Sequence, residues 1–354
     1  MSNANGRRIK CIIKILRRKN FKLKKKILSC ILAACISLAL PVAITGCGGN
    51  KNVIKINEVT HSVFYAPLYL ADALGYFEDE GYTIELENGG GADKTMAAVL
   101  SGSVDIGFCG PEAAIYTFLG GDEDAPKVFG QMTNRDGSFL VGREDIENFD
   151  WHSLDGKDVL AGRPGGVPLM TFKYVMKELG VTPNYVTNID FNFMTSSFQG
   201  GTADYCTMFE PVASDYEKAG SGYVLGSVGA LAGEIPYTCF IAKQSFIDSN
   251  GEKIEALLRA VTKATKYIYE TDSQTVAEKI VSYFASTSVE SIKTSIDSYK
   301  AIDTWVENMA MKESGFNRLQ DIIESAGELS QRVEFSDLVL TETANKIYNE
   351  VYAK

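Results

Sequence analysis

The chain of 354 residues is longer than one small domain requires and suits about two domains. Its formal net charge is −10, but 11 of its 35 Lys and Arg residues lie within residues 1–46, which hold no Asp or Glu. Residues 47–354 contain the other 24 Lys and Arg residues and all 45 acidic residues, so they carry a charge near −21. Because neutralising phosphates needs clustered Lys and Arg, this acidic body argues against nucleic-acid binding.

A basic run and then an apolar, uncharged segment at 27–45 open the chain, and the segment leads into Ile44-Thr45-Gly46-Cys47. This order is typical of a secretory signal peptide, and the last four residues resemble the lipobox of bacterial lipoproteins, in which the Cys is acylated. A permanent transmembrane helix is the alternative, since 19 apolar residues nearly span a bilayer. We expect 1–46 to be a cleaved lipoprotein signal peptide, Cys47 to carry lipid and 47–52 to be a tether.

The elements of the first half alternate between strands and helices. The patterns predict strands at 53–59, 83–88, 104–108, 127–133 and 138–144, and helices at 65–81, 92–102 and 111–121. The alternation restarts after Trp151, with a strand at 158–163 and a helix at 167–180. The next segments are 190–194, a short helix, 203–209 and 211–220. Strands are then expected at 223–228 and 237–246. From 251 onward the pattern is helical. This rhythm predicts an α/β fold with parallel-rich sheets.

A weak internal repeat links the two halves. Residues 101–105 lead to Gly110-Pro111-Glu112, and residues 200–204 lead to Glu210-Pro211. Each is a helix end, a turn, a strand and then a Glu beside a Pro that opens a helix. We therefore expect two similar α/β lobes with a ligand cleft at the carboxyl ends of their strands.

Glycine-rich loops mark the candidate site in each half. Gly90 and Gly91 precede a helix, whose free N–H groups can meet a ligand; a flexible turn is the alternative. Arg163 with Gly165 and Gly166 is the counterpart, and adds a cation that could pair with an anionic or carbonyl-bearing ligand; a surface Arg is the alternative. Neither loop has a phosphate-loop or dinucleotide spacing.

The other candidate ligand contacts lie in loops at strand ends. They are His61, Tyr65, Gly110, Glu112, Arg135, Phe209, Glu210 and Tyr237. The two glutamates would accept hydrogen bonds from ligand N–H groups, with helix capping as the equally weighted alternative. The aromatic pair after the first strand, Phe64 and Tyr65, could stack on a ring or only pack the loop against the helix. The loop around Arg135 could rim the cleft or be a simple turn, and the loop before Tyr237 could be part of the cleft or a hinge.

Catalysis and metal binding have little support in the sequence. There are two histidines, His61 and His152, and no HExxH motif. Cys109, Cys206 and Cys239 remain in the exported part, an odd number with no CxxC spacing, which favours small buried side chains over a disulfide framework or a zinc site. We expect no cofactor, no metal and no enzymatic activity.

The stretches YAPLYLADALGYFEDEGYTIEL (65–86) and GGADKTMAAVLSGSVDIGFCGPEA (90–113) resemble the N-terminal lobe of bacterial ABC-importer substrate-binding proteins. This superfamily handles aliphatic sulfonates, taurine, nitrate and a pyrimidine precursor of thiamine. The resemblance runs in order from residue 53 to about 245; the C-terminal helices match only in character. Its motifs are fairly specific to the superfamily and say little about the ligand.

The resemblance implies a type II periplasmic-binding fold with lobe 1 at 53–140 and 241–354 and lobe 2 at 141–240. The crossings between the lobes would lie near 138–144 and 236–243, and the lobes would close on a small molecule by a hinge motion. It also implies an extracytoplasmic protein held at the cell membrane by lipid, with the permease and its ATPase as separate chains. The loops after the first strand and around Glu112, Arg163 and Glu210 would line the cleft.

The departures from the family bear on the ligand. Two glutamates in the cleft would suit a ligand with N–H groups, such as an aminopyrimidine, another nitrogen heterocycle or taurine, better than nitrate or a plain alkanesulfonate. Two other functions stay open: a ligand sensor feeding a membrane partner, and an enzyme resembling the thiamine pyrimidine synthases. The cysteine-rich CCCFC-type signature of those enzymes is missing from this sequence.

Overall fold

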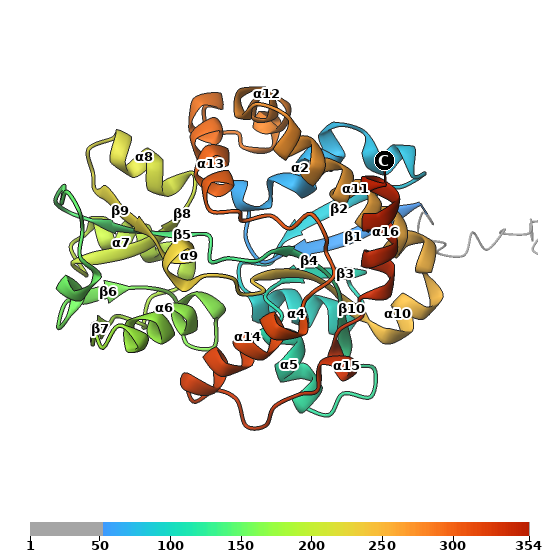
Figure 1. The fold of residues 1–354 in the computed structure, drawn as a ribbon, viewed down its shortest axis with the longest axis horizontal. Coiled ribbons are helices and arrows are strands. Elements are labelled where there is room, and N and C mark those ends of the chain that lie inside the picture. The colour runs from blue at the N-terminus through green and yellow to red at the C-terminus, as the bar shows by residue number, and fades with distance from the viewer. Residues whose placement is uncertain (1–51, 354) are drawn as a thin grey trace, which may run out of the picture. The chain divides into compact units, whose positions relative to one another are not determined.

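The structure, a computed structural model, describes residues 52–353 (Figure 1). The expected signal peptide and Cys47 lie outside the described residues. Within 52–353, no helix has both the length and the apolar composition needed to cross a membrane.

Two five-stranded sheets organise the described chain, and we call each sheet with its flanking helices a lobe (Figure 1). The sheet of lobe 1 has the order β2 (Thr83–Asn88), β1 (Val53–Glu58), β3 (Ile106–Cys109), β10 (Thr238–Lys243), β4 (Pro126–Thr133). The sheet of lobe 2 has the order β7 (Asn184–Tyr185), β6 (Asp158–Leu160), β8 (Tyr205–Phe209), β5 (Ser138–Gly142), β9 (Tyr223–Ser227). The domain limits expected at 140 and 240 fall inside β5 and β10.

Helices connect the strands within each lobe. Lobe 1 contains η1 (Val63–Tyr65), α2 (Ala66–Ala73), α3 (Tyr76–Asp79), α4 (Ala92–Ser101) and α5 (Glu112–Leu119). Lobe 2 contains η2 (Trp151–Leu154), α6 (Val167–Glu178), η3 (Phe191–Phe193), α7 (Met194–Gln199), α8 (Val212–Lys218) and α9 (Val228–Ala232).

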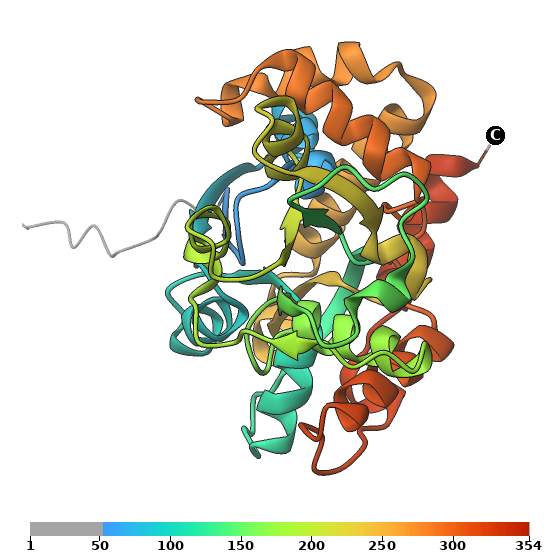
Figure 2. The ribbon, with the colours of Figure 1, turned by 90° about the vertical axis from the view of Figure 1, so that its left-hand side faces the viewer.

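The C-terminal third is helical, as expected. Its elements are α10 (Gln244–Ser249), α11 (Gly251–Glu270), α12 (Ser273–Ile280), η4 (Val281–Tyr283), α13 (Val289–Ala301), α14 (Glu313–Ser325), α15 (Phe335–Leu338) and α16 (Glu342–Tyr352). In Figure 2 the orange helices lie at the top and the red helices at the right. The clear amphipathic pattern of α11 buries residues such as Leu257, Leu258 and Val261 against lobe 1.

The sheets are mixed, which corrects the expectation of parallel-rich sheets. Four strand pairs are parallel and four are antiparallel. Every antiparallel pair includes β5 or β10. These two strands enter their sheets directly from the other lobe, without the helical crossover that parallel neighbours need. An alternating pattern of strands and helices does not reveal such an exchange.

Two other expectations were wrong in detail. The helix expected at 65–81 is interrupted at Gly75, whose φ of 74° lies in the left-handed region, so that α2 and α3 are separate. The strand expected at 237–246 ends at Lys243, because residues 244–249 form α10. The short elements β7 and α9 were not expected.

Two chain segments, 134–137 and 233–237, connect the lobes and lie side by side. Ile235 donates its backbone N–H to the carbonyl of Asn134 at 2.7 Å, and Tyr237 donates to Thr133 at 3.0 Å. The stretches expected as crossings begin close to where these segments end.

A third segment, 302–312, lies against the same place. Its residue Thr304 accepts from the Asn134 N–H at 3.0 Å, and Val306 donates to Met132 at 3.0 Å. Trp305 also donates from its indole N–H to the carbonyl of Phe64 at 2.8 Å. Three segments, from three distant parts of the sequence, therefore form the hinge region.

The cysteines of the described chain pack as small apolar side chains, as expected. Cys109, Cys206 and Cys239 are free and fully buried. Burial raises the pKa of the Cys206 thiol to about 12, and it also raises the pKa values of Cys109 and Cys239 well above their ordinary value. All three thiols are therefore protonated near neutral pH.

Candidate functional site

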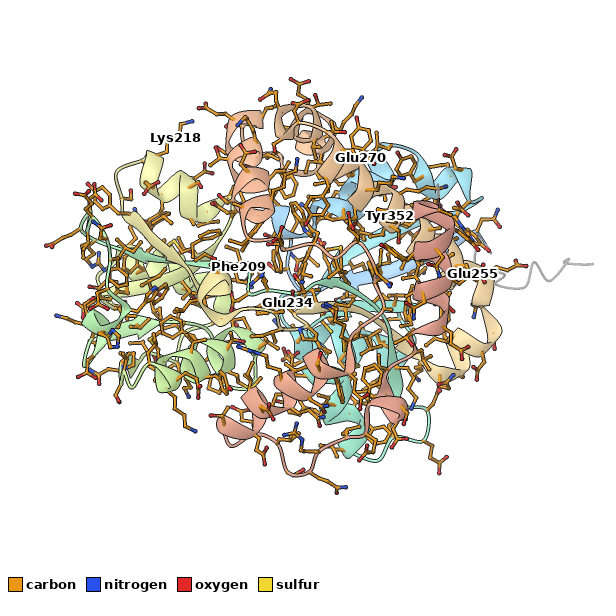
Figure 3. The ribbon with its side chains drawn as sticks, in the orientation of Figure 1. Phe209, Lys218, Glu234, Glu255, Glu270 and Tyr352 are labelled. Carbon is orange, nitrogen blue, oxygen red and sulfur yellow. The ribbon has the colours of Figure 1, made fainter. Side chains whose placement is uncertain are left out.

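Two adjoining cavities open where the carboxyl ends of β1, β3 and β8 face the first turns of α4, α5 and α6. The inner cavity has a volume of about 90 Å³ and the outer one about 660 Å³. Four residues line both of them: Ala92, Glu112, Arg163 and Gly166. The lining comes from both lobes, and Phe209, labelled in Figure 3, belongs to the wall that lobe 2 supplies.

Eight residues expected at the site line the inner cavity: Tyr65, Gly91, Gly110, Glu112, Arg163, Gly166, Phe209 and Tyr237. Gly165 lines the outer one. Sequence reasoning missed the other residues of the inner wall, which are Val59, Thr60, Ala92, Val167, Pro168 and Thr238. All six lie within three residues of an expected position along the chain, so their nearness to the expected loops was the available signal.

Glu112 begins α5 and is the central ionisable group of the site. Its side chain is 2% exposed and bends back over Gly110. A Cβ on Gly110 would overlap the carboxyl group and would lie 2.6 Å from Glu112 Cδ, so only glycine leaves room for this arrangement. The Gly-Pro-Glu loop thus places a carboxyl group where a neighbouring side chain would otherwise stand.

The environment of Glu112 disfavours its ionised form. Burial raises the pKa of this carboxyl to about 8, although backbone N–H groups of Glu112, Val167 and Ala113 act in the opposite direction. Val167 belongs to lobe 2, so the carboxyl group faces N–H groups from both lobes. Its Oε2 atom has no hydrogen-bond partner among the described residues. A buried acceptor without a donor is costly, which marks this oxygen as a position for a ligand donor.

Aromatic rings form much of the inner wall. Tyr65 and Tyr237 are 2% and 5% exposed, and the ring centroids of Phe209 and Tyr237 are 6.4 Å apart. The Tyr237 hydroxyl lies near the buried Asp136 carboxyl group. Neither that hydroxyl nor Asp136 Oδ2 makes a hydrogen bond of acceptable geometry within the described chain.

Asp136 lies in the first connecting segment, directly behind Tyr237. It is fully buried, and its Oδ1 accepts from the N–H and hydroxyl groups of Ser138 at 2.7 and 2.5 Å. Burial raises its pKa to about 6, while the Ser138 bonds and the nearby Tyr237 hydroxyl lower it. A second carboxyl group therefore stands close to the inner cavity.

Arg163 spans the mouth of the site. Its guanidinium lies 3.2 Å from Asp93 of α4 in lobe 1 and 3.6 Å from Asp190 in lobe 2. Both carboxylates compete with a ligand for this charge. Arg163 therefore acts here as a bridge between the lobes, alongside its position in both cavity walls.

The two glycine loops beside this bridge contain backbone conformations that favour glycine. A Cβ on Gly91 would lie 3.1 Å from the Arg163 guanidinium, and the φ of 150° at Gly91 itself favours glycine. Gly165, with φ of 79°, donates its N–H to Glu328 at 3.1 Å.

Four expected residues lie outside both cavity walls: His61, Gly90, Arg135 and Glu210. His61 Nδ1 and Nε2 lie 2.7 Å from Glu58 Oε1 and 2.9 Å from the carbonyl of Tyr283. Gly90 stands next to the inner wall, and Arg135 belongs to the first connecting segment. Ligand contacts of these residues stay a prediction.

Glu210 has the helix-capping arrangement that was its alternative. Its carboxylate accepts from the N–H of Ser214 at 3.0 Å and from the Ser214 hydroxyl at 2.6 Å, in the first turn of α8. It is 2% exposed, and burial raises its pKa while the Ser214 bonds lower it. The two matched glutamates therefore differ: both oxygens of Glu210 are hydrogen-bonded, whereas Glu112 leaves one oxygen unpaired.

Within residues 52–353, no group of three or more His, Cys, Asp and Glu side chains is placed to hold a metal ion. The chemistry that the site offers is instead a hydrogen-bond acceptor, aromatic faces and one paired cation.

The protein resembles known sequences along most of its length. A model of the family described as NMT1/THI5 like matches residues 63–275. YtlA of Bacillus subtilis (strain 168), which its name describes as a candidate binding protein, is 37% identical and covers 90% of this chain and 97% of its own. A 4-amino-5-hydroxymethyl-2-methylpyrimidine phosphate synthase of Aspergillus parasiticus is 26% identical over 58% of this chain and 63% of its own.

Solved structures share the fold at low sequence identity. The periplasmic nitrate-binding protein NrtA of Synechocystis PCC 6803 has a TM-score of 0.69 at 16% identity, over 86% of this chain and 90% of its own. The alkanesulfonate-binding protein SsuA of Xanthomonas axonopodis pv. citri has a TM-score of 0.66 at 14% identity, over 82% and 98%. They confirm the periplasmic-binding fold. With a family model over residues 63–275 and a relative at 37% identity over 90% of the chain, the protein belongs to the NMT1/THI5-like family.

Proposed function

We propose that the protein is an extracytoplasmic solute-binding lipoprotein, which captures a small polar molecule containing nitrogen or sulfonate and delivers it to an ABC importer permease. The similarity to YtlA and to the fold of NrtA and SsuA supports this assignment. One observation carries it: a cavity enclosed by both lobes contains a buried carboxyl group whose Oε2 atom lacks a partner within the described chain.

Binding would use the hinge region and the bridge at the mouth. Lobe 1, at 53–140 and 241–354, and lobe 2, at 141–240, would move about the segments near 134–137 and 233–237. Closure brings Asp93 to Arg163 and the Val167 N–H to Glu112, so contacts between the lobes form over the bound molecule. The permease and its ATPase would be separate chains.

The membrane anchor is a separate part of the proposal. Cleavage after Gly46 and acylation of Cys47 would hold the protein on the outer side of the cell membrane. Replacing Cys47 with Ala should release the protein or leave it uncleaved. Acyl-labelled product from the Cys47→Ala variant would contradict this part of the proposal.

An enzymatic role has less support, although the similarity to pyrimidine phosphate synthases is an argument in its favour. The sequence lacks the CCCFC-type cysteine signature that the resemblance to those enzymes would require. The three cysteines within the described residues are buried, and each is separated from the others by at least 30 positions in the chain. A sensor that passes its signal to a membrane partner would use the same cavity.

Native mass spectrometry of the protein purified from its own host tests the proposed function. A small molecule should be retained, and deletion of the ABC permease that receives it should abolish its uptake. Retention without any loss of uptake would favour the sensor, and chemical turnover of the retained molecule would favour the enzyme.

A further inference from the structure

The inner cavity contains a buried polar atom, Glu112 Oε2, that has no hydrogen-bond partner within the described chain. The Tyr237 hydroxyl also lines the cavity, and it lies close to the carboxyl group of Asp136, whose pKa it lowers. All three side chains are at least 95% buried. The Tyr237 hydroxyl can donate to Asp136, which leaves Glu112 Oε2 as the atom that a ligand can reach. Once its proton has left, the Glu112 carboxylate offers the ligand a hydrogen-bond acceptor.

We propose that this cavity binds the head group of a nitrogen cation that carries N–H donors, of the amidinium or guanidinium class. The inference rests on the proposed solute-binding function and adds the charge and donor pattern of the ligand.

The charges around the site favour a cation over an oxyanion. Among the described residues that line the two cavities, Arg163 is the only cation, and it already faces Asp93 and Asp190. Glu112 and Asp136 lack any such cationic partner at hydrogen-bond distance within the described chain. A nitrogen cation would pair with the Glu112 carboxylate, whereas a sulfonate or nitrate would require Glu112 to remain protonated.

Size and shape narrow the class. The inner cavity, at about 90 Å³, is much smaller than the outer one at about 660 Å³, which suits a small head group. Tyr65, Phe209 and Tyr237 line the inner cavity, and aromatic rings attract cations. The larger cavity, which shares Glu112 and Gly166, leaves space for the rest of a longer molecule.

The same geometry couples binding to protons. Since burial raises the pKa of Glu112 to about 8, the empty site holds a proton near neutral pH. A bound cation would stabilise the carboxylate, so the proton would leave to the buffer and affinity should rise with pH up to about pH 8. An anion held by the protonated carboxyl would show the opposite trend.

Titration calorimetry on the full-length protein in detergent, after removal of co-purified ligand, provides the test. The probes are the chloride salts of acetamidinium, guanidinium and tetramethylammonium and the sodium salts of methanesulfonate and nitrate, all at millimolar concentration and equal ionic strength. We expect binding of acetamidinium or guanidinium with release of up to one proton. Tetramethylammonium has no N–H donor and should bind at least ~10-fold more weakly.

Three variants show whether the cation uses the inner cavity. Glu112→Gln should weaken binding at least ~10-fold and abolish proton release. Glu85→Gln, on the exposed strand β2 outside both cavities, should leave both unchanged. Glu112→Asp, which keeps the carboxyl group, should restore proton release in part. That recovery would show that the loss in Glu112→Gln does not come from a folding defect.

The outcomes separate the cation from the broader function. Binding of methanesulfonate or nitrate with proton uptake would refute the proposal of a cationic ligand but would still agree with a solute-binding protein. Failure of both acetamidinium and guanidinium to bind the folded protein would also refute the proposal of a cationic ligand. An anion found bound in protein from the native host would refute it as well, but would agree with the proposed solute-binding function.

Discussion

The buried carboxyl of Glu112 should make the ligand-free protein less stable as pH rises, and Glu112→Gln should remove most of that loss. The pKa is about 8 in the folded protein against an ordinary value of 4.5, so the folded state binds the proton more tightly. The contribution is fully present below about pH 4.5, falls as pH rises, and is gone above about pH 8. Each pH unit inside this window costs up to about 1.4 kcal/mol.

Between about pH 5 and pH 8 the difference amounts to on the order of 4 kcal/mol, a large part of the usual stability of a domain. Urea unfolding of the wild type and of Glu112→Gln at several pH values measures it. Asp136, with its pKa raised to about 6, affects both proteins alike, so the difference between them isolates Glu112. Parallel stability curves for the two proteins would refute the buried, mostly protonated state described here.

Three further predictions follow from the packing. Gly110→Ala should push the Glu112 carboxyl out of place and weaken ligand binding at least ~10-fold by calorimetry; unchanged affinity would contradict the close packing. Asp93→Asn should speed ligand dissociation about twofold to fivefold in stopped-flow measurements, because its half-exposed ion pair with Arg163 contributes about 1 kcal/mol or less; an unchanged rate at low salt would argue against the bridge. The three buried cysteines should resist alkylation until urea unfolds the protein, as followed by intact mass; rapid native labelling would contradict their burial.

Much of the fold could be predicted from local patterns. Strand β2 was expected at its observed bounds, and the helices that became α4, α5 and α6 were expected within a few residues. The crossings near β5 and β10 were expected only from the family resemblance, and the antiparallel pairing of these strands was not expected, because strand direction depends on where distant parts of the chain meet. Gly75 also escaped notice, since a single glycine in an apolar helical pattern is often tolerated.

The candidate site was predictable to the level of loops and no further. Glu112 and Glu210 occupy matching places in the sequence, and the pattern gave them equal weight. Ser214, one turn into α8, supplies both hydrogen bonds that satisfy Glu210. The corresponding position after Glu112 is Tyr116, whose hydroxyl is directed instead to the sulfur of Met170 at 3.6 Å. The residue four positions along the helix therefore decides whether the carboxyl group is fully hydrogen-bonded, as in Glu210, or keeps an unpaired oxygen, as in Glu112.

The third segment of the hinge region has a consequence for the order in which the protein assembles. Tyr299, near the C-terminal end of α13, accepts from the Glu210 N–H at 3.0 Å and donates to the carbonyl of Gly137 at 3.1 Å. Trp305 then bonds to Phe64, from the first element after β1. Because a chain is synthesised from its N-terminus, Tyr299 and Trp305 become available only after both connecting segments and the strands of both sheets. A product that ends before Tyr299 would therefore contain both sheets but would lack the contacts that the third segment adds between them.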